Sequence, residues 1–270
     1  MERKIAHRSF GSSHGFITRM ISPNDIGELT KPFVFLDFIN GTPPKGAGFG
    51  WHPHSGIATF TYQIEGGSQI EESTGNKVAF GPRDVEYLQA GSGAWHRGAP
   101  NTETPIKGFQ LWIALPPELE QQAAKSRFLT KNEFEKVDHV IILLGDYKGH
   151  KSKIVPPNDM NYFEVSIEKG QAWNYTPPAS HNVLWIQVFE GSLNGNINAR
   201  EGELIVFEEG SQDINFTTDS GVKFILGSAK KFEHNLFLGR SSVHTSQEAL
   251  DKSLEKINEI YSDLAQQNKL

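Results

Sequence analysis

The sequence predicts an all-β fold of two β-barrels in tandem, with a few short helices and one helix near the C-terminal end. The first observation is a series of short runs rich in β-branched and aromatic residues, separated by turn signals. These runs cover residues 34–39, 58–64, 78–80, 109–114, 140–144, 162–167, 183–189, 204–207 and 222–226. Many short strands joined by turns are typical of β-sandwiches and β-barrels.

The second observation is an internal similarity. Residues 63–68 are Gln-Ile-Glu-Gly-Gly-Ser, and residues 187–192 are Gln-Val-Phe-Glu-Gly-Ser. In each copy a strand-like run ends in this turn, and a second glycine-containing turn follows. We therefore expect two similar barrels, the first in residues 1–130 and the second in residues 131–270 together with the C-terminal helix.

Two helices are expected. Prolines and an acidic residue at positions 116–118 suit a first helical turn, so we expect a short helix over residues 116–125 that links the barrels. Thr245 and Glu248 form a capping-box pattern at the start of a C-terminal helix. Its apolar stripe should pack on a barrel, with a dimer contact as the alternative. The stripe consists of Leu250, Leu254, Ile257, Tyr261 and Leu264.

Composition excludes several classes of function. The 270 residues are 37% hydrophobic, which is enough for a buried core, and the formal net charge of -6 argues against direct nucleic-acid binding. The chain has no cysteine, so it has no disulfide, thiolate metal site or cysteine nucleophile. No apolar run approaches the ~20 residues that span a bilayer, and no signal-peptide pattern is present. We expect a soluble, cytoplasmic protein without a membrane partner.

Three histidines supply the candidate chemistry. His52 and His54 form an H-x-H triplet, and His96 follows a glycine-rich turn at 90–93. Side chains two positions apart on a strand project to the same face, so both histidines of the triplet can reach one ion. Neutral imidazole suits iron, copper, nickel or zinc, whereas calcium and magnesium prefer oxygen ligands. We find no nucleophile elbow, P-loop or dinucleotide fingerprint, so this cluster is the one chemical candidate.

Several motifs around these histidines resemble the first cupin domain of the pirin family. They are Gly-Phe-Gly-Trp-His-Pro-His-Ser-Gly at 48–56, Gln-Ile-Glu-Gly at 63–66, Gly-Pro-Arg-Asp-Val at 81–85 and Ala-Gly-Ser-Gly-Ala-Trp-His at 90–96. The resemblance covers about residues 34–116 and is weaker afterwards. It implies two cupin (jelly-roll) barrels, with one mononuclear iron site in the N-terminal barrel.

The sequence departs from the family at the metal site. The resemblance assigns His52, His54 and His96 as ligands, but Gly98 stands where the family has a ligating glutamate. The family also carries a glutamate four positions after the second histidine, and here that position is Ala58. A bound metal would then have three neutral ligands. Iron is the expected ion, zinc, nickel and copper are alternatives, and a metal-free site stays open.

The second barrel is expected to hold no metal. The internal similarity aligns Pro177, Ala179 and Thr217 with the three histidines, and none of these is a strong ligand. His181 lies nearby in the sequence, and we expect it to be a loop histidine or a hydrogen-bonded core histidine.

The resemblance implies quercetin 2,3-dioxygenase-type chemistry, a metal-dependent oxidoreductase reaction on a small aromatic substrate. Neither Ala58 nor Gly98 can take a proton, so no catalytic residue is assigned. The alternative is a regulatory or interaction protein that modulates transcription or metabolic enzymes through a protein partner, with a structural or redox-sensing metal. A degenerate, metal-free cupin that acts as a binding module is the third hypothesis.

Overall fold

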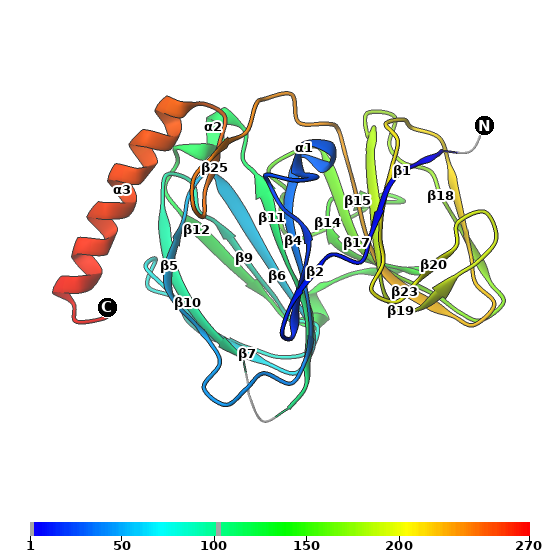
Figure 1. Cartoon of the computed structure of the whole chain (residues 1–270), viewed down its shortest axis with the longest axis horizontal. Helices are drawn as coiled ribbons and strands as arrows, with labels where there is room; N and C mark the ends of the chain where they lie inside the picture. Colours follow the sequence, from blue (N-terminus) through cyan, green and yellow to red (C-terminus); the bar gives the residue numbers. More distant parts are fainter. Residues whose placement is uncertain (1–2, 101–103) are drawn as a thin grey trace. The chain divides into compact units, whose positions relative to one another are not determined.

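The computed structural model describes residues 3–100 and 104–270, which form two compact units. We call the unit with the three histidines the N-terminal barrel and the other the C-terminal barrel. The N-terminal barrel consists of residues 12–28, 32–131 and 233–270. The described part of the C-terminal barrel consists of residues 3–11, 29–31 and 132–232. Each unit is thus assembled from segments that are distant in sequence (Figure 1).

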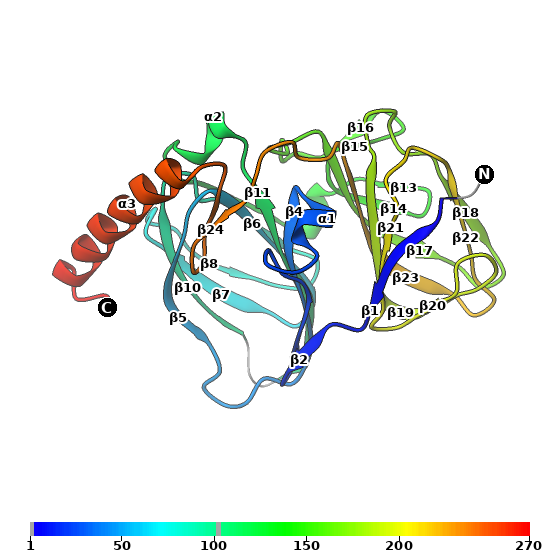
Figure 2. The ribbon, with the colours of Figure 1, turned by 45° about the horizontal axis from the view of Figure 1, so that its top comes forward.

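The N-terminal barrel has two main antiparallel sheets, which curve around a common interior (Figures 1 and 2). The larger sheet has the order β12-β9-β6-β11-β4-β3-β2. Its strands are β2 (Ser12–His14), β3 (Ile17–Ile21), β4 (Phe33–Gly41), β6 (Ile57–Glu65), β9 (Val85–Gln89), β11 (Ile106–Ala114) and β12 (Lys125–Leu129). The smaller sheet has the order β5-β10-β7-β8, with β5 (Phe49–His54), β7 (Ser68–Glu72), β8 (Lys77–Phe80) and β10 (Ala94–Pro100).

The C-terminal barrel is built around one eight-stranded sheet of order β1-β21-β19-β23-β17-β14-β13, in which β20 also pairs with β19. Its strands are β1 (Ile5–Ser9), β13 (Lys136–Val137), β14 (Val140–Leu144), β17 (Met160–Ile167), β19 (Val183–Leu193), β20 (Ala199–Arg200), β21 (Leu204–Phe207) and β23 (Val222–Ala229). Two two-stranded sheets complete it: β15 (Asp146–Tyr147) with β16 (His150–Lys151), and β18 (Ala172–Tyr175) with β22 (Ile214–Thr217). The expected all-β fold class is confirmed.

The helices are few. They are α1 (Gly27–Thr30), α2 (Pro117–Glu120), the 3-10 turn η1 (Lys131–Glu133) and α3 (Gln247–Gln266). The helix expected over 116–125 is therefore wrong at its C-terminal end, because the backbone from Lys125 onwards pairs with β9. The expected cap is also shifted by one residue, since the side chain of Ser246 accepts the hydrogen bond from the Ala249 N–H. No helix among the described residues is long and apolar enough to cross a membrane.

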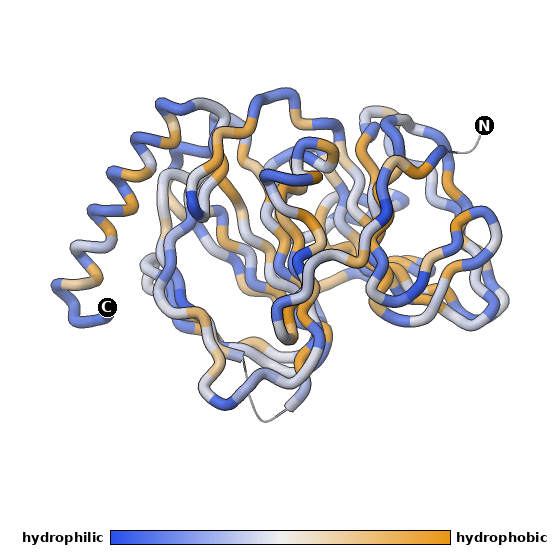
Figure 3. Tube along the Cα trace, in the orientation of Figure 1, coloured by the Kyte–Doolittle hydropathy of each residue, from blue (hydrophilic) through white to orange (hydrophobic). Residues whose placement is uncertain are grey.

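The long helix α3 packs on the N-terminal barrel, where it contacts β10 and β25 (Val243–His244). Leu250, Ile257 and Leu264 are buried on its inner face. In Figure 3 hydrophobic and hydrophilic stretches alternate along this helix, as expected for a helix with one apolar face. The Trp95 indole on β10 donates a hydrogen bond of 2.9 Å to the Ile257 carbonyl. The helix thus braces the strand that also carries His96.

A buried polar network holds the segment before α3 against the N-terminal barrel. Glu120, at the end of α2, accepts hydrogen bonds from the backbone N–H of Thr245 at 2.8 Å and from its hydroxyl at 2.6 Å. Nδ1 of His244 lies 3.1 Å from the same carboxylate, and its Nε2 lies 3.0 Å from the Ser55 hydroxyl. Gly56 allows this close approach, because a Cβ there would lie 2.0 Å from the Val243 carbonyl oxygen.

We predict that Glu120→Gln lowers the free energy of unfolding by about 1 to 3 kcal/mol, because an amide leaves at least one buried donor of this network without an acceptor. Urea unfolding of purified protein measures the change. The exposed Glu118 lies on the same short helix, so Glu118→Gln is the matched control and should leave stability unchanged. Equal stability of the two variants would show that the network does not hold the segment.

Candidate metal centre

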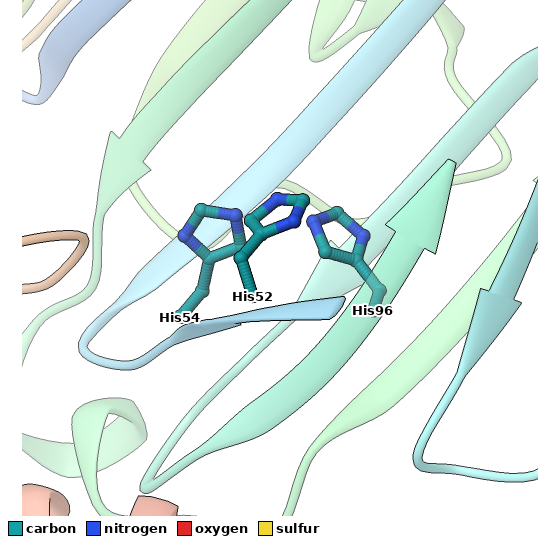
Figure 4. Close-up of side chains that lie close together, drawn as sticks. All are labelled: His52, His54 and His96. Carbon is teal, nitrogen blue, oxygen red and sulfur yellow. The ribbon is translucent and has the colours of Figure 1, made fainter. Parts of the chain in front are cut away.

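The structure brings the three sequence-predicted histidines together on one side of β5 and β10. His96 lies directly opposite His52 in the antiparallel pairing of these strands, and His54 is two positions along β5. The ring centroids are 4.4 Å apart for His52 and His96, 4.9 Å for His54 and His96, and 5.1 Å for His52 and His54. One nitrogen of each ring lies within 4.8 Å of the others, and Figure 4 shows these nitrogens turned toward one another.

Backbone carbonyls fix two of the three rings. Nδ1 of His52 lies 2.8 Å from the Gly50 carbonyl oxygen, and Nδ1 of His54 lies 3.0 Å from the Ser241 carbonyl oxygen. A carbonyl can only accept, so in both rings Nδ1 carries the hydrogen and Nε2 offers a lone pair. Both ring nitrogens of His96 are buried without a hydrogen-bond partner. An orphaned imidazole beside two oriented lone pairs fits a bound metal ion.

Burial keeps all three rings neutral. It lowers the pKa of His54 to about 3, with a smaller contribution from His52. Burial also lowers the pKa of His52, and it places the pKa of His96 well below its ordinary value. A neutral ring has a free lone pair, so protons do not compete for the cluster near neutral pH.

The cluster opens into a cavity of about 340 Å³ in the N-terminal barrel. A stack of side chains forms one wall: the Arg19 guanidinium lies 3.9 Å above the Phe35 ring, which stacks on Trp112 at 4.0 Å. Trp112 in turn meets the His54 ring edge-on at 4.9 Å. Polar side chains on the lining are Asp37, Thr61, Gln63, Ser68, Gln69 and Gln110. A cavity that combines an aromatic wall with polar groups suits a small, flat organic molecule with polar substituents.

The two positions of the missing carboxylates differ in their relation to the cavity. Gly98 lines it, two positions after His96 on β10, and a Cβ there would lie an ordinary 3.4 Å from Ile70. Ala58 lies on β6, where Thr61 and Gln63 face the cavity, so strand alternation places Ala58 on the opposite face. A carboxylate at position 58 would therefore point away from the histidine cluster, which leaves Gly98 as the position where one could reach it.

One functional candidate was missed by the sequence analysis. Glu86, on β9, is fully buried, and its Oε1 lies 3.9 Å from Nδ1 of His96. Its Oε2 accepts a 2.6 Å hydrogen bond from the Thr61 hydroxyl. Burial raises the pKa of Glu86 to about 8. The available signal was a carboxylate inside a strand that is otherwise largely apolar, since charged residues are almost never fully buried without a partner.

In the C-terminal barrel His181 is a hydrogen-bonded core histidine. Its Nδ1 lies 2.9 Å from the Ser228 hydroxyl, and its Nε2 lies 3.0 Å from Asp159. Both ring nitrogens thus have partners within the protein. Within residues 3–100 and 104–270, His52, His54 and His96 form the one group of three or more side chains placed to hold a metal ion.

The chain is similar in sequence to several known proteins. Residues 16–113 match the family model described as Pirin. The chain is 26% identical to a Pseudomonas aeruginosa protein named "Putative quercetin 2,3-dioxygenase", over 94% of each chain. It is 32% identical to human pirin over 57% of this chain and 54% of that protein.

Solved structures share the fold. A quercetin 2,3-dioxygenase from Acinetobacter baumannii superposes with a TM-score of 0.86 at 19% identity, covering 96% of this chain and 98% of that one. A bacterial pirin from Escherichia coli in complex with nickel(II) gives a TM-score of 0.67 at 22% identity, covering 85% and 98%.

The expected cupin fold is confirmed by the likeness to these solved structures. The resemblance to the pirin family stated from the sequence is confirmed for residues 16–113.

We predict a pH dependence of stability that comes from His54. Its pKa is about 3 when folded and 6.5 when exposed, so between these values the unfolded chain binds a proton that the folded chain does not. Protonation of His54 in the unfolded chain therefore does not lower the free energy of unfolding above pH 6.5. At pH 5 it should lower the free energy of unfolding of the metal-free protein by about 2 kcal/mol. Urea unfolding at several pH values should therefore show that the free energy of unfolding falls more steeply with decreasing pH in the wild type than in His54→Asn. Parallel curves for the two proteins would contradict the assignment.

Proposed function

We propose that the N-terminal barrel binds one divalent transition-metal ion through Nε2 of His52, His54 and His96. The observation that carries the proposal is the set of three neutral imidazoles, two buried and one partly buried, with one nitrogen each within 4.8 Å of the others. Three histidine ligands are sufficient for a working metal site, and they leave further coordination positions for water or substrate.

We propose iron as the resident ion, with nickel, copper or zinc as competitors. Imidazole ligands suit all four, and affinity in the divalent series rises toward copper, so the ligands alone do not select iron. Gly98 contributes no charge to the coordination sphere, and the bound ion therefore keeps its full positive charge among neutral ligands. Such a centre makes a bound water or phenolic oxygen more acidic.

We further propose quercetin 2,3-dioxygenase-type chemistry on a small aromatic substrate. The cavity supports this substrate class, because aromatic rings form one wall of the cavity and the three histidines line the same cavity. A bound metal would supply the Lewis acid for a phenolic oxygen. The chain's own part is to hold the flat substrate beside Phe35 and Trp112 and to exclude water from it. The relative named for this activity supports the proposal.

We predict about one equivalent of metal in wild-type protein loaded with iron or zinc, because the cluster offers one set of three ligands. Elemental analysis after desalting measures it. His54→Ala should lose most of the metal, since two imidazoles seldom suffice for tight binding. His181→Ala is the matched control, because that buried ring already has two partners, and it should keep the full metal content. A wild type that takes up neither ion would refute the metal proposal.

We predict that quercetin binds the metal-loaded protein and shifts its own absorbance band, because a flavonol oxygen becomes a metal ligand. Metal-free protein and His54→Ala should give no such shift. Oxygen uptake in step with quercetin loss would then establish the dioxygenase reaction. A full metal load with neither binding nor oxygen uptake would contradict the substrate assignment and favour the regulatory hypothesis.

A further inference from the structure

We propose that Glu86 is the positioning residue of the metal centre: its carboxylate accepts the hydrogen bond from Nδ1 of metal-bound His96. This inference rests on the proposed metal site and concerns a residue that neither the motif nor the spacing of the histidines indicates. Backbone carbonyls accept the Nδ1 hydrogen bonds of His52 and His54. We assign the same role, for His96, to a carboxylate that is not itself a metal ligand.

The first argument is an asymmetry among the three ligands. His52 and His54 each have a carbonyl oxygen within 3.0 Å of Nδ1, which fixes the tautomer and leaves Nε2 for the metal. His96 has no such acceptor within hydrogen-bond distance, although its ring is buried. Metal-ligating histidines almost always donate their other N–H to a carboxylate, carbonyl or water. The third ligand therefore needs an acceptor on its Nδ1 side.

The second argument is that the missing acceptor is already beside it. Oε1 of Glu86 lies 3.9 Å from Nδ1 of His96, and both atoms are buried and without a hydrogen-bond partner. A buried polar atom without a hydrogen-bond partner lowers the free energy of unfolding. Here the donor and the acceptor are separated by about one ångström more than the length of a hydrogen bond. A small movement of either side chain would satisfy both atoms.

The third argument is that Glu86 is held for this task. Its other oxygen, Oε2, accepts from the Thr61 hydroxyl at 2.6 Å, and Thr61 accepts from the Gln110 amide at 3.3 Å. Thr61 and Gln110 both line the cavity. The hydrogen bond to Oε2 thus holds the carboxyl group in place, and Oε1 is the oxygen on the side of His96.

A second buried carboxylate provides the comparison. Glu72 lies opposite His96 in the pairing of β7 with β10, and it is as buried as Glu86. Its Oε2 accepts from Thr74, Asn76 and Ser126. Among the described residues, Glu86 is the one carboxylate within 4.0 Å of a ring nitrogen of His96. Proximity to the ring on its Nδ1 side, and not burial of a charge alone, distinguishes Glu86.

The consequence is a better ligand at the third position of the metal centre. A carboxyl oxygen that accepts the Nδ1 hydrogen fixes the tautomer of His96 and makes its Nε2 more electron-rich. This arrangement raises metal affinity without occupying a coordination position. The open positions then stay available for substrate.

The test compares zinc affinity of the wild type, Glu86→Gln and Glu72→Gln by competition with a chromophoric chelator. Gln keeps the shape and an oxygen for the Thr61 hydrogen bond, but it turns an amide N–H, in place of an acceptor, toward Nδ1 of His96. We expect Glu86→Gln to weaken zinc binding by about 10- to 100-fold, the usual effect of removing such a partner. Glu72→Gln, the matched control, should bind like the wild type. Equal affinity of Glu86→Gln and the wild type would overturn the inference while leaving the metal site intact.

A second measurement does not depend on how the variants fold. In zinc-loaded, ¹⁵N-histidine-labelled wild type, nuclear magnetic resonance should show a proton on Nδ1 of His96 that is protected from exchange and shifted downfield. Zinc on Nδ1, or an Nδ1 proton that exchanges freely, would contradict the role of Glu86. If the wild type binds no zinc, the proposed metal site itself fails and this inference falls with it.

Discussion

The antiparallel pairing of β5 with β10 is the constraint on which the site depends. It sets His96 directly opposite His52, and strand alternation brings His54 to the same face. A shift of one residue in this pairing would turn the ring of His96 away from the other two. Helix α3 braces β10 through Trp95 and the apolar face that it buries. The position of the C-terminal segment is thus coupled to the geometry of the cluster.

Burial gives the cluster its chemical character. Burial lowers the pKa of all three imidazoles, so they are neutral near pH 7. Each ring therefore offers a lone pair without first having to release a proton. The same burial leaves His96 without a partner for either nitrogen, and it leaves Glu86 with one free oxygen beside it. Gly98 offers no ligand, and the nearest carboxyl group, that of Glu86, lies behind His96 on its Nδ1 side.

The sequence predicts the fold class and the histidine cluster well, because both depend on local patterns: short strands between turns, and an H-x-H triplet with a third histidine after a glycine-rich turn. A charged residue within a largely apolar strand marks Glu86 as unusual, but its place beside His96 depends on tertiary structure, because β9 and β10 belong to different sheets. The face of Ala58 and the assignment of the chain's two ends to barrels also follow from tertiary pairing. The strand β1 pairs with β21, for example, which no local pattern indicates.

The central claim is that three imidazoles, and no carboxylate, ligate one metal ion in the N-terminal barrel. X-ray absorption spectroscopy of zinc-loaded protein tests it directly. We expect a first shell of three imidazole nitrogens at about 2.0 to 2.1 Å with the remaining position filled by water oxygen. The outer-shell scattering should be that of imidazole rings. A first shell dominated by oxygen, or one that includes a carboxylate in place of a histidine, would contradict the account.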